Sequence, residues 1–228
     1  MEPMSTAKPQ PDVDEEVRAL DGRTPGKRGR ATREKLLKCT SDLLEKSSYR
    51  DLTVIDIAKC AGTSPATFYQ YFQDVEGAIL VLAEEMASNG KSLTSLIRDS
   101  DWKGRNGGET ALALVDEFLG LWERHRPILR VVDLATAEGD LRFQNIRTHL
   151  LNEVTLGLRD VIEDFRASGK HARDTDAMAQ AATIVSMLAH VAQHRYGFEF
   201  WGIRLDDIRK SLARILYSGL TGKRAPEA

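Results

Sequence analysis

Apolar residues recur along most of the chain at spacings of three and four, which is typical of amphipathic helices rather than of strands. Glycine, proline and aspartate residues interrupt this pattern at intervals suited to helix ends. The pattern predicts helices over residues 31–46, 52–60, 64–71, 74–98, 108–124, 126–138, 140–168, 174–200 and 205–220. We therefore expect an all-α protein of about nine helices, the first three forming a separate amino-terminal group.

A tight turn between two short helices is predicted around Gly62. A glycine directly after a helix can adopt the left-handed conformation that ends it. Ser64 then stands where a hydroxyl caps the next helix, and Pro65 occupies its first turn, where the missing N–H costs nothing. Helix, short turn and second helix form a helix-turn-helix, whose second helix enters the DNA major groove.

The second of these helices has two chemically different sides. At about 100° per residue, Phe68 and Phe72 share one side, where they can anchor the helix in a core. Ala66, Thr67 and Gln70 lie on the other side. A glutamine can hydrogen-bond adenine, and methyl groups can contact thymine, so this side is the candidate reading surface, with Tyr69 and Tyr71 on its flanks.

These residues together resemble the signature of the tetracycline-repressor (TetR/AcrR) family of bacterial transcriptional regulators. The matching positions are Thr53-Val54-x-x-Ile57-Ala58-x-x-Ala61-Gly62-x-Ser64-x-x-Thr67-Phe68-Tyr69-x-Tyr71-Phe72. The resemblance implies that Thr53 contacts a phosphate. It also implies that the operator is faced by Pro65, Ala66, Thr67, Tyr69, Gln70 and Tyr71. We add the capping residue Ser64 to this candidate DNA-binding surface. Family members often carry a lysine shortly after this signature, whereas Gln73, Asp74, Val75 and Glu76 follow here.

A basic cluster precedes the signature and can replace the missing lysine as a phosphate contact. It consists of Arg23, Lys27, Arg28, Arg30, Arg33, Lys35 and Lys38, with Glu34 as the single acid. Arg28, Arg30 and Arg33 are our candidate phosphate contacts, because a basic arm before the first helix could neutralise phosphates or enter the minor groove. The alternative for the segment from Arg23 to Arg28 is a solvated tail.

Composition adds few constraints. The net charge is −2, 42% of residues are hydrophobic and 29% are charged, as in an ordinary globular protein. Residues 1–22 combine prolines with an acidic run, which predicts a disordered tail. A cytoplasmic protein is expected, because no long apolar segment or secretory leader is recognisable. Cys39 and Cys60 are interpreted as core residues, with a redox pair as the alternative.

The second half of the chain has no sharp motif. Aromatic residues and polar residues within apolar runs suggest a ligand cavity, and a lipophilic effector is expected. The candidate lining residues are Phe118, Trp122, Phe143, His149, Asn152, Thr155, Met187 and His190. The polar members are included because a buried polar group needs a partner. No Arg or Lys cluster pointing to a phosphorylated effector is apparent.

The last two predicted helices have broad apolar faces that suit a four-helix dimer interface. The expected organisation is a disordered tail (1–22), a helix-turn-helix domain with its basic arm (23–73) and an effector-binding and dimerisation domain (74–228). The resemblance implies a homodimeric repressor that binds a palindromic operator and is released by an effector. A DNA-binding architectural or regulatory protein without a small-molecule effector is the alternative.

Enzymatic sequences are not recognisable, so no catalytic residue, cofactor or metal is expected. His190 and His194 are four residues apart, which is a metal-ligand spacing, but Val191 replaces the glutamate of the metalloprotease pattern. A membrane partner is likewise not expected.

Overall fold

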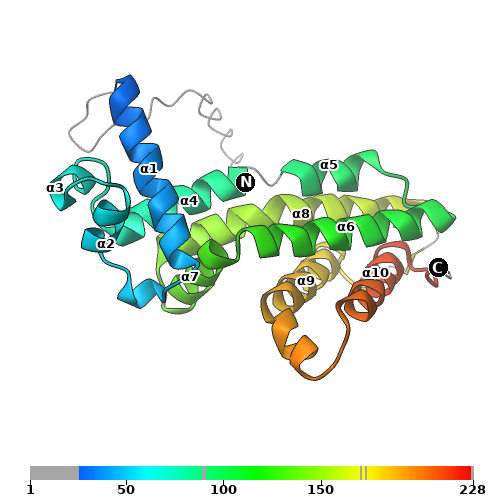
Figure 1. Cartoon of the computed structure of the whole chain (residues 1–228). Coiled ribbons are helices and arrows are strands. Elements are labelled where there is room, and N and C mark those ends of the chain that lie inside the picture. Colours follow the sequence, from blue (N-terminus) through cyan, green and yellow to red (C-terminus); the bar gives the residue numbers. More distant parts are fainter. Residues whose placement is uncertain (1–25, 89–90, 170, 173, 227–228) are drawn as a thin grey trace, which may run out of the picture. The chain divides into compact units, whose positions relative to one another are not determined.

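The computed structural model describes residues 26–88, 91–169, 171–172 and 174–226, and it contains helices and no strands within these ranges (Figure 1). The all-α prediction is therefore confirmed. The expected tail at residues 1–22 lies outside the described residues. The chain divides into two compact units, residues 1–78 and 79–228. Each unit is described here by itself.

From residue 26 onward, the first unit contains three helices, one 3₁₀ turn and the beginning of a fourth helix. In chain order these are α1 (Lys27–Leu44), η1 (Tyr49–Asp51), α2 (Val54–Cys60), α3 (Pro65–Phe68) and α4 (Val75–Ser88). The core between them is apolar and includes Leu36, Ile57 and Phe68, each with no exposed surface. Asp74 caps α4, because its Oδ1 accepts a hydrogen bond of 2.6 Å from Gly77 N. A small core of this kind fixes the orientation of α3.

The second unit is built from longer helices. They are α5 (Lys91–Asp99), α6 (Gly104–Arg124), α7 (Arg126–Ala137), α8 (Leu141–Ala167), α9 (Ala177–Phe200) and α10 (Leu205–Thr221). The most extensive contacts join α10 to α6, α9 to α8 and α7 to α8. Phe118, Phe143 and Leu158 have no exposed surface and form the centre of this core. No helix in the described ranges has both the length and the apolar content to cross a membrane.

One predicted helix start was wrong, and one predicted helix spans a gap in the described residues. The predicted helix 74–98 corresponds to α4 and α5, and residues 89 and 90 between them lie outside the described residues. The predicted loop before residue 108 ends earlier, because α6 already begins at Gly104. Gly107 lies within this helix, and a Cβ there would lie 2.3 Å from the Trp102 carbonyl oxygen. The close approach requires glycine and does not indicate a loop.

The apolar faces of α9 and α10 serve mainly the core of the protomer. Ile184, Val185 and Leu188 of α9 are buried, as are Ile208 and Leu212 of α10. These faces were the sequence-based reason for placing a dimer interface here, and that reason was wrong for these residues. Large apolar side chains that stay exposed on the same two helices are Met178, Phe200 and Ile215, which are 38%, 87% and 51% exposed.

Candidate nucleic-acid interface and ligand cavity

The candidate reading helix is held by a cap at its start and by two aromatic anchors. Ser64 Oγ accepts a hydrogen bond of 3.2 Å from Thr67 N, and Pro65 occupies the first turn, both as predicted. The α-helix itself ends at Phe68, and hydrogen-bonded turns continue the segment to Phe72. The Phe68 and Phe72 rings are buried with centroids 5.4 Å apart. The side opposite them is therefore held out from the core.

The predicted DNA-facing residues lie mostly on this exposed side. Tyr69 is 53% exposed although it follows the fully buried Phe68. The exposed members are Thr53, Ser64, Pro65, Ala66, Tyr69 and Gln70, and the half-buried members are Thr67 and Tyr71. Two hydroxyls already have local partners: Thr67 Oγ1 lies 3.0 Å from Ser64 Oγ, and Thr53 Oγ1 donates to Asp56. The larger free surface for base contacts is thus formed by Ala66, Tyr69 and Gln70.

The basic cluster is partly helical. Arg28 and Arg30 are exposed in the first turns of α1, whereas Arg23 lies outside the described residues. The interpretation as an extended minor-groove arm is wrong for Arg28 and Arg30, because α1 already begins at Lys27. Arg33 is half-buried, and its guanidinium lies 5.5 Å from the centre of the Phe72 ring. A phosphate contact by these three arginines stays a prediction.

The two cysteines correct another sequence interpretation. Cys39 of α1 and Cys60 of α2 form a disulfide, with their Cα atoms 5.8 Å apart. Cys39 is buried, but Cys60 is exposed. The interpretation of both residues as simple core packing was wrong, because their sequence separation of 21 residues says nothing about the approach of α1 to α2. The bond joins the first helix of the unit to the helix that precedes the turn.

The candidate effector residues do not converge on one cavity. Phe118, Trp122 and Phe143 are buried, and the Phe118 and Trp122 rings stack with centroids 4.9 Å apart. Thr155 is buried and donates to Leu151 O at 2.8 Å, so it needs no ligand. The assumption of buried polar groups was wrong for His149, Asn152 and His190, whose side chains are exposed, and Met187 is half-buried. Of the eight, only Trp122 lines either of the two cavities described below.

One cavity of about 360 Å³ lies where α6, α7 and α9 meet. Its lining residues are Trp122, Glu123, Arg126, Leu129, Arg130, Asp133, Ala192, Gln193 and His194. Two of these residues, Arg126 and Arg130, were not among the candidate effector residues predicted from the sequence. Arg126 and Arg130 are one helical turn apart on α7, and that spacing was the available signal.

Hydrogen bonds around this cavity occupy its carboxylates. Glu123 accepts from the Tyr196 hydroxyl at 2.7 Å and pairs with Arg195 at 3.0 Å. Asp133 pairs with Arg147 at 2.9 Å. Both acids are therefore neutralised by arginines that do not line the cavity.

A histidine at the junction of α6 and α7 has a shifted titration. Burial lowers the pKa of the His125 imidazole, and the adjacent Arg124 guanidinium lowers it further. His125 also follows the last residue of α6 and precedes the first residue of α7. Its neutral form is therefore favoured where the two helices meet.

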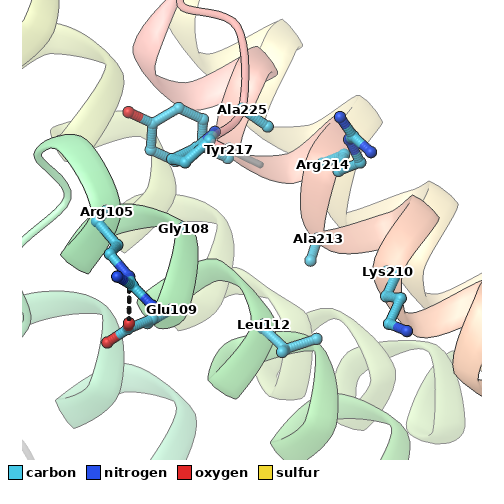
Figure 2. A pocket seen from close by; sticks show the side chains of 10 residues that line it. Arg105, Gly108, Glu109, Leu112, Lys210, Ala213, Arg214, Tyr217 and Ala225 are labelled. Carbon is cyan, nitrogen blue, oxygen red and sulfur yellow. Dashed lines mark ion pairs between the residues drawn. The ribbon is translucent and has the colours of Figure 1, made fainter. Parts of the chain in front are cut away.

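A second cavity, of about 290 Å³, lies between α6 and α10 (Figure 2). Leu112 of α6 and Ala213 of α10 lie on opposite sides of it. Arg105 on its rim pairs with Glu109 at 3.4 Å, and Lys210 pairs with Asp206 at 2.6 Å. Most of its charged groups thus already have partners. No group of acidic, histidine or cysteine side chains suited to a metal occurs in the part of the chain that the structure describes.

The fold and the capped reading helix define a DNA-binding transcriptional regulator, and comparison with known families agrees. Residues 36–77 match the model of the bacterial regulatory proteins of the tetR family, and residues 93–227 match the model of the tetracyclin repressor-like C-terminal domain. The second match alone covers more than half of the chain. The chain therefore belongs to the tetR family, as the resemblance in its sequence indicated.

Individual relatives are distant in sequence. An uncharacterized HTH-type transcriptional regulator of Bacillus subtilis, YvdT, is 26% identical over 172 residues, which are 73% of this chain and 84% of that protein. FadR of Bacillus subtilis in complex with stearoyl-CoA has a TM-score of 0.62 at 18% identity, covering 82% of this chain and 98% of that one. FadR of Thermus thermophilus in complex with lauroyl-CoA has a TM-score of 0.56 at 19% identity, covering 86% and 98%. At this identity the two structures show a shared fold.

Proposed function

We propose that this regulator is a repressor that binds a palindromic operator as a homodimer and is released by a small effector. The observation that carries the proposal is the exposed, capped segment from Ser64 to Tyr71, held by the buried Phe68 and Phe72. Two such segments, related by a twofold axis, can read half-sites about one DNA turn apart. Such a regulator acts in the cytoplasm, where its operator is.

The dimer is proposed to form through α9 and α10. Support comes from apolar side chains that remain exposed on these helices after the protomer core is complete, Met178 and Ile215. Burying such surface against a second copy is favourable at about 25 cal/mol per Å² of apolar area. Pairing two helices from each copy would give a four-helix bundle.

The effector is proposed to bind within the second unit and to be amphipathic. The same fold holds stearoyl-CoA in one FadR protein and lauroyl-CoA in another. An effector can shift the equilibrium between the DNA-bound and released states only by the difference between its binding free energies for these two states. The alternative, a DNA-binding protein without any effector, predicts the same operator binding but no ligand-dependent release.

Selection of bound fragments from random duplex DNA, followed by sequencing, tests the first half of this proposal. The expected result is a palindromic site that the purified full-length protein binds as a dimer. Binding that is salt-sensitive and independent of sequence would contradict it, since phosphate contacts alone give no sequence preference. Once a site is known, release by acyl-CoA and by simpler amphipathic compounds tests the second half.

A further inference from the structure

We propose that the cavity between α6, α7 and α9 is a binding site for a small organic anion, whose carboxylate or phosphate group contacts Arg126, Arg130 and Trp122. The link between anion binding and DNA release rests on the proposed function. Anion binding itself follows from the groups around the cavity and can be measured without DNA.

The indole of Trp122 provides the first reason. Trp122 lines this cavity, its side chain is 5% exposed, and its Nε1 has no hydrogen-bond partner among the described residues. Leaving a buried N–H donor without an acceptor destabilises the folded protein. By contrast, the buried indole of Trp102 donates to Ile97 O at 3.0 Å. A ligand oxygen that reaches the buried Nε1 from the cavity would supply the acceptor that Trp122 lacks.

The balance of charge provides the second reason. The two carboxylates of the cavity, those of Glu123 and Asp133, are bound by Arg195 and Arg147 from outside it. Arg126 stacks over the Tyr196 ring, with its guanidinium carbon 4.0 Å from the ring centre. The structure shows no carboxylate partner for Arg126 or Arg130 in the described part of the chain. Two guanidinium groups are therefore available for an anion, and guanidinium geometry suits carboxylates and phosphates.

The position of α7 provides the third reason. Arg126, Leu129 and Arg130 come from its first turns, so the positive end of the helix dipole lies beside the cavity. Leu129, Ala192 and Trp122 are the apolar residues of the lining. A cavity of about 360 Å³ is near the lower end of the usual range for small-molecule sites. These features fit a compact ligand with one anionic group and a small apolar body.

The two possible headgroups can be distinguished by calorimetry on the full-length protein. We would titrate benzoate, phenyl phosphate, inorganic phosphate and the neutral benzyl alcohol at constant ionic strength. The expected result is saturable binding of at least one aromatic anion, with benzyl alcohol at least about tenfold weaker because it lacks the charge-assisted hydrogen bonds. Preference for benzoate or for phenyl phosphate then identifies the headgroup.

Variants connect the binding to this cavity. Arg130→Gln removes an exposed guanidinium and should weaken binding about 10- to 100-fold. Trp122→Phe removes the unpaired N–H and should weaken it about tenfold, with thermal unfolding used to check that the variant is folded. The matched control is Arg124→Gln, because Arg124 is also near the α6–α7 junction but pairs with Glu117 at 2.9 Å and does not line the cavity.

The outcomes separate the two proposals. Absence of saturable anion binding, or equal loss in Arg124→Gln and Arg130→Gln, would overturn the cavity as an anion site. If an anion binds with the expected dependence on Arg130 but leaves the selected operator occupied, the site stands and effector control through it fails. If an effector releases the operator equally from the wild type and from Arg130→Gln, regulation stands and this inference fails.

Discussion

At the scale of single residues, neighbouring positions in the reading segment have opposite environments. Phe68 has no exposed surface, whereas Tyr69, the next residue, is 53% exposed. A rotation of about 100° per residue places the buried anchor Phe68 and the candidate DNA contact Tyr69 on different sides of the segment. Substitutions on the exposed side should therefore change DNA binding without changing stability.

The double variant Tyr69→Ala with Gln70→Ala tests this separation, because both side chains are exposed. We expect a folded protein whose affinity for its selected operator falls about 10- to 100-fold, because base contacts contribute about 1–3 kcal/mol each. Fluorescence anisotropy with the selected duplex measures the change. Ser47→Ala, an exposed position outside the reading segment, serves as the control, and equal affinity in all three proteins would exclude this segment as the reading surface.

His125 gives a prediction for pH. Because burial and Arg124 lower its pKa in the folded protein, the unfolded chain takes up a proton at a higher pH than the folded protein does. Stability should therefore fall as pH decreases through about 6.5, the ordinary histidine pKa. His125→Gln, which does not titrate, should lose less stability between pH 7.5 and 5.5 in urea unfolding. An identical loss of stability in the variant would show that His125 does not contribute to this pH dependence.

At the scale of elements, the first turn of α6 packs so closely on Trp102 and Tyr217 that Gly107 has no room for a side chain. A Cβ at Gly107 would lie 2.3 Å from the Trp102 carbonyl oxygen and 2.8 Å from the Tyr217 ring. Gly197 in α9 has no atom within 4 Å of its corresponding position. The two glycines share a helical environment and differ in the space around them.

Alanine at these two positions should have opposite effects. Gly107→Ala is expected to destabilise the protein by about 1–3 kcal/mol through overpacking. Gly197→Ala is expected to stabilise it by about 0.5–1 kcal/mol through helix propensity. Chemical denaturation of both variants measures the difference, and a neutral Gly107→Ala would mean that the start of α6 relaxes without cost.

The disulfide between α1 and α2 is a second feature at the scale of elements. Joining Cys39 to Cys60 across 21 residues restricts the unfolded chain, which stabilises the folded unit by ~3 kcal/mol. Reductant should therefore lower the thermal midpoint of the oxidised wild type but leave Cys60→Ser unchanged. Mass spectrometry of the alkylated, non-reduced protein establishes the starting state. A reductant effect of equal size in both proteins would contradict the role of this bond.

At the scale of the whole molecule, the proposed dimer depends on surface that the protomer core leaves exposed. Ile215 on α10 is 51% exposed, and a charge there would be costly in an apolar interface. Ile215→Glu should shift the protein from dimer to monomer in light scattering and weaken operator binding. Leu141→Glu, at a position 68% exposed on α8, should not, and a monomeric wild type would contradict the proposed dimer.

Local chemistry made the amino-terminal unit predictable from sequence. Capping by Ser64, the proline at Pro65 and the anchors Phe68 and Phe72 act within a few residues of one another, so their pattern specifies the turn and the exposed side. The all-α class followed equally from helical spacing, which each segment carries by itself. The family resemblance followed from these same positions.

The proposed ligand cavity, the disulfide and the start of α6 were decided only by tertiary structure. Arg126, Arg130 and Trp122 line one cavity because α6 packs on both α7 and α9, and Cys39 meets Cys60 because α1 packs on α2. Exposure of His149 and Asn152 depends in the same way on which side of α8 faces the core. Contacts between residues distant in the chain depend on how whole helices pack, and the spacing of residues within one helix does not contain that information.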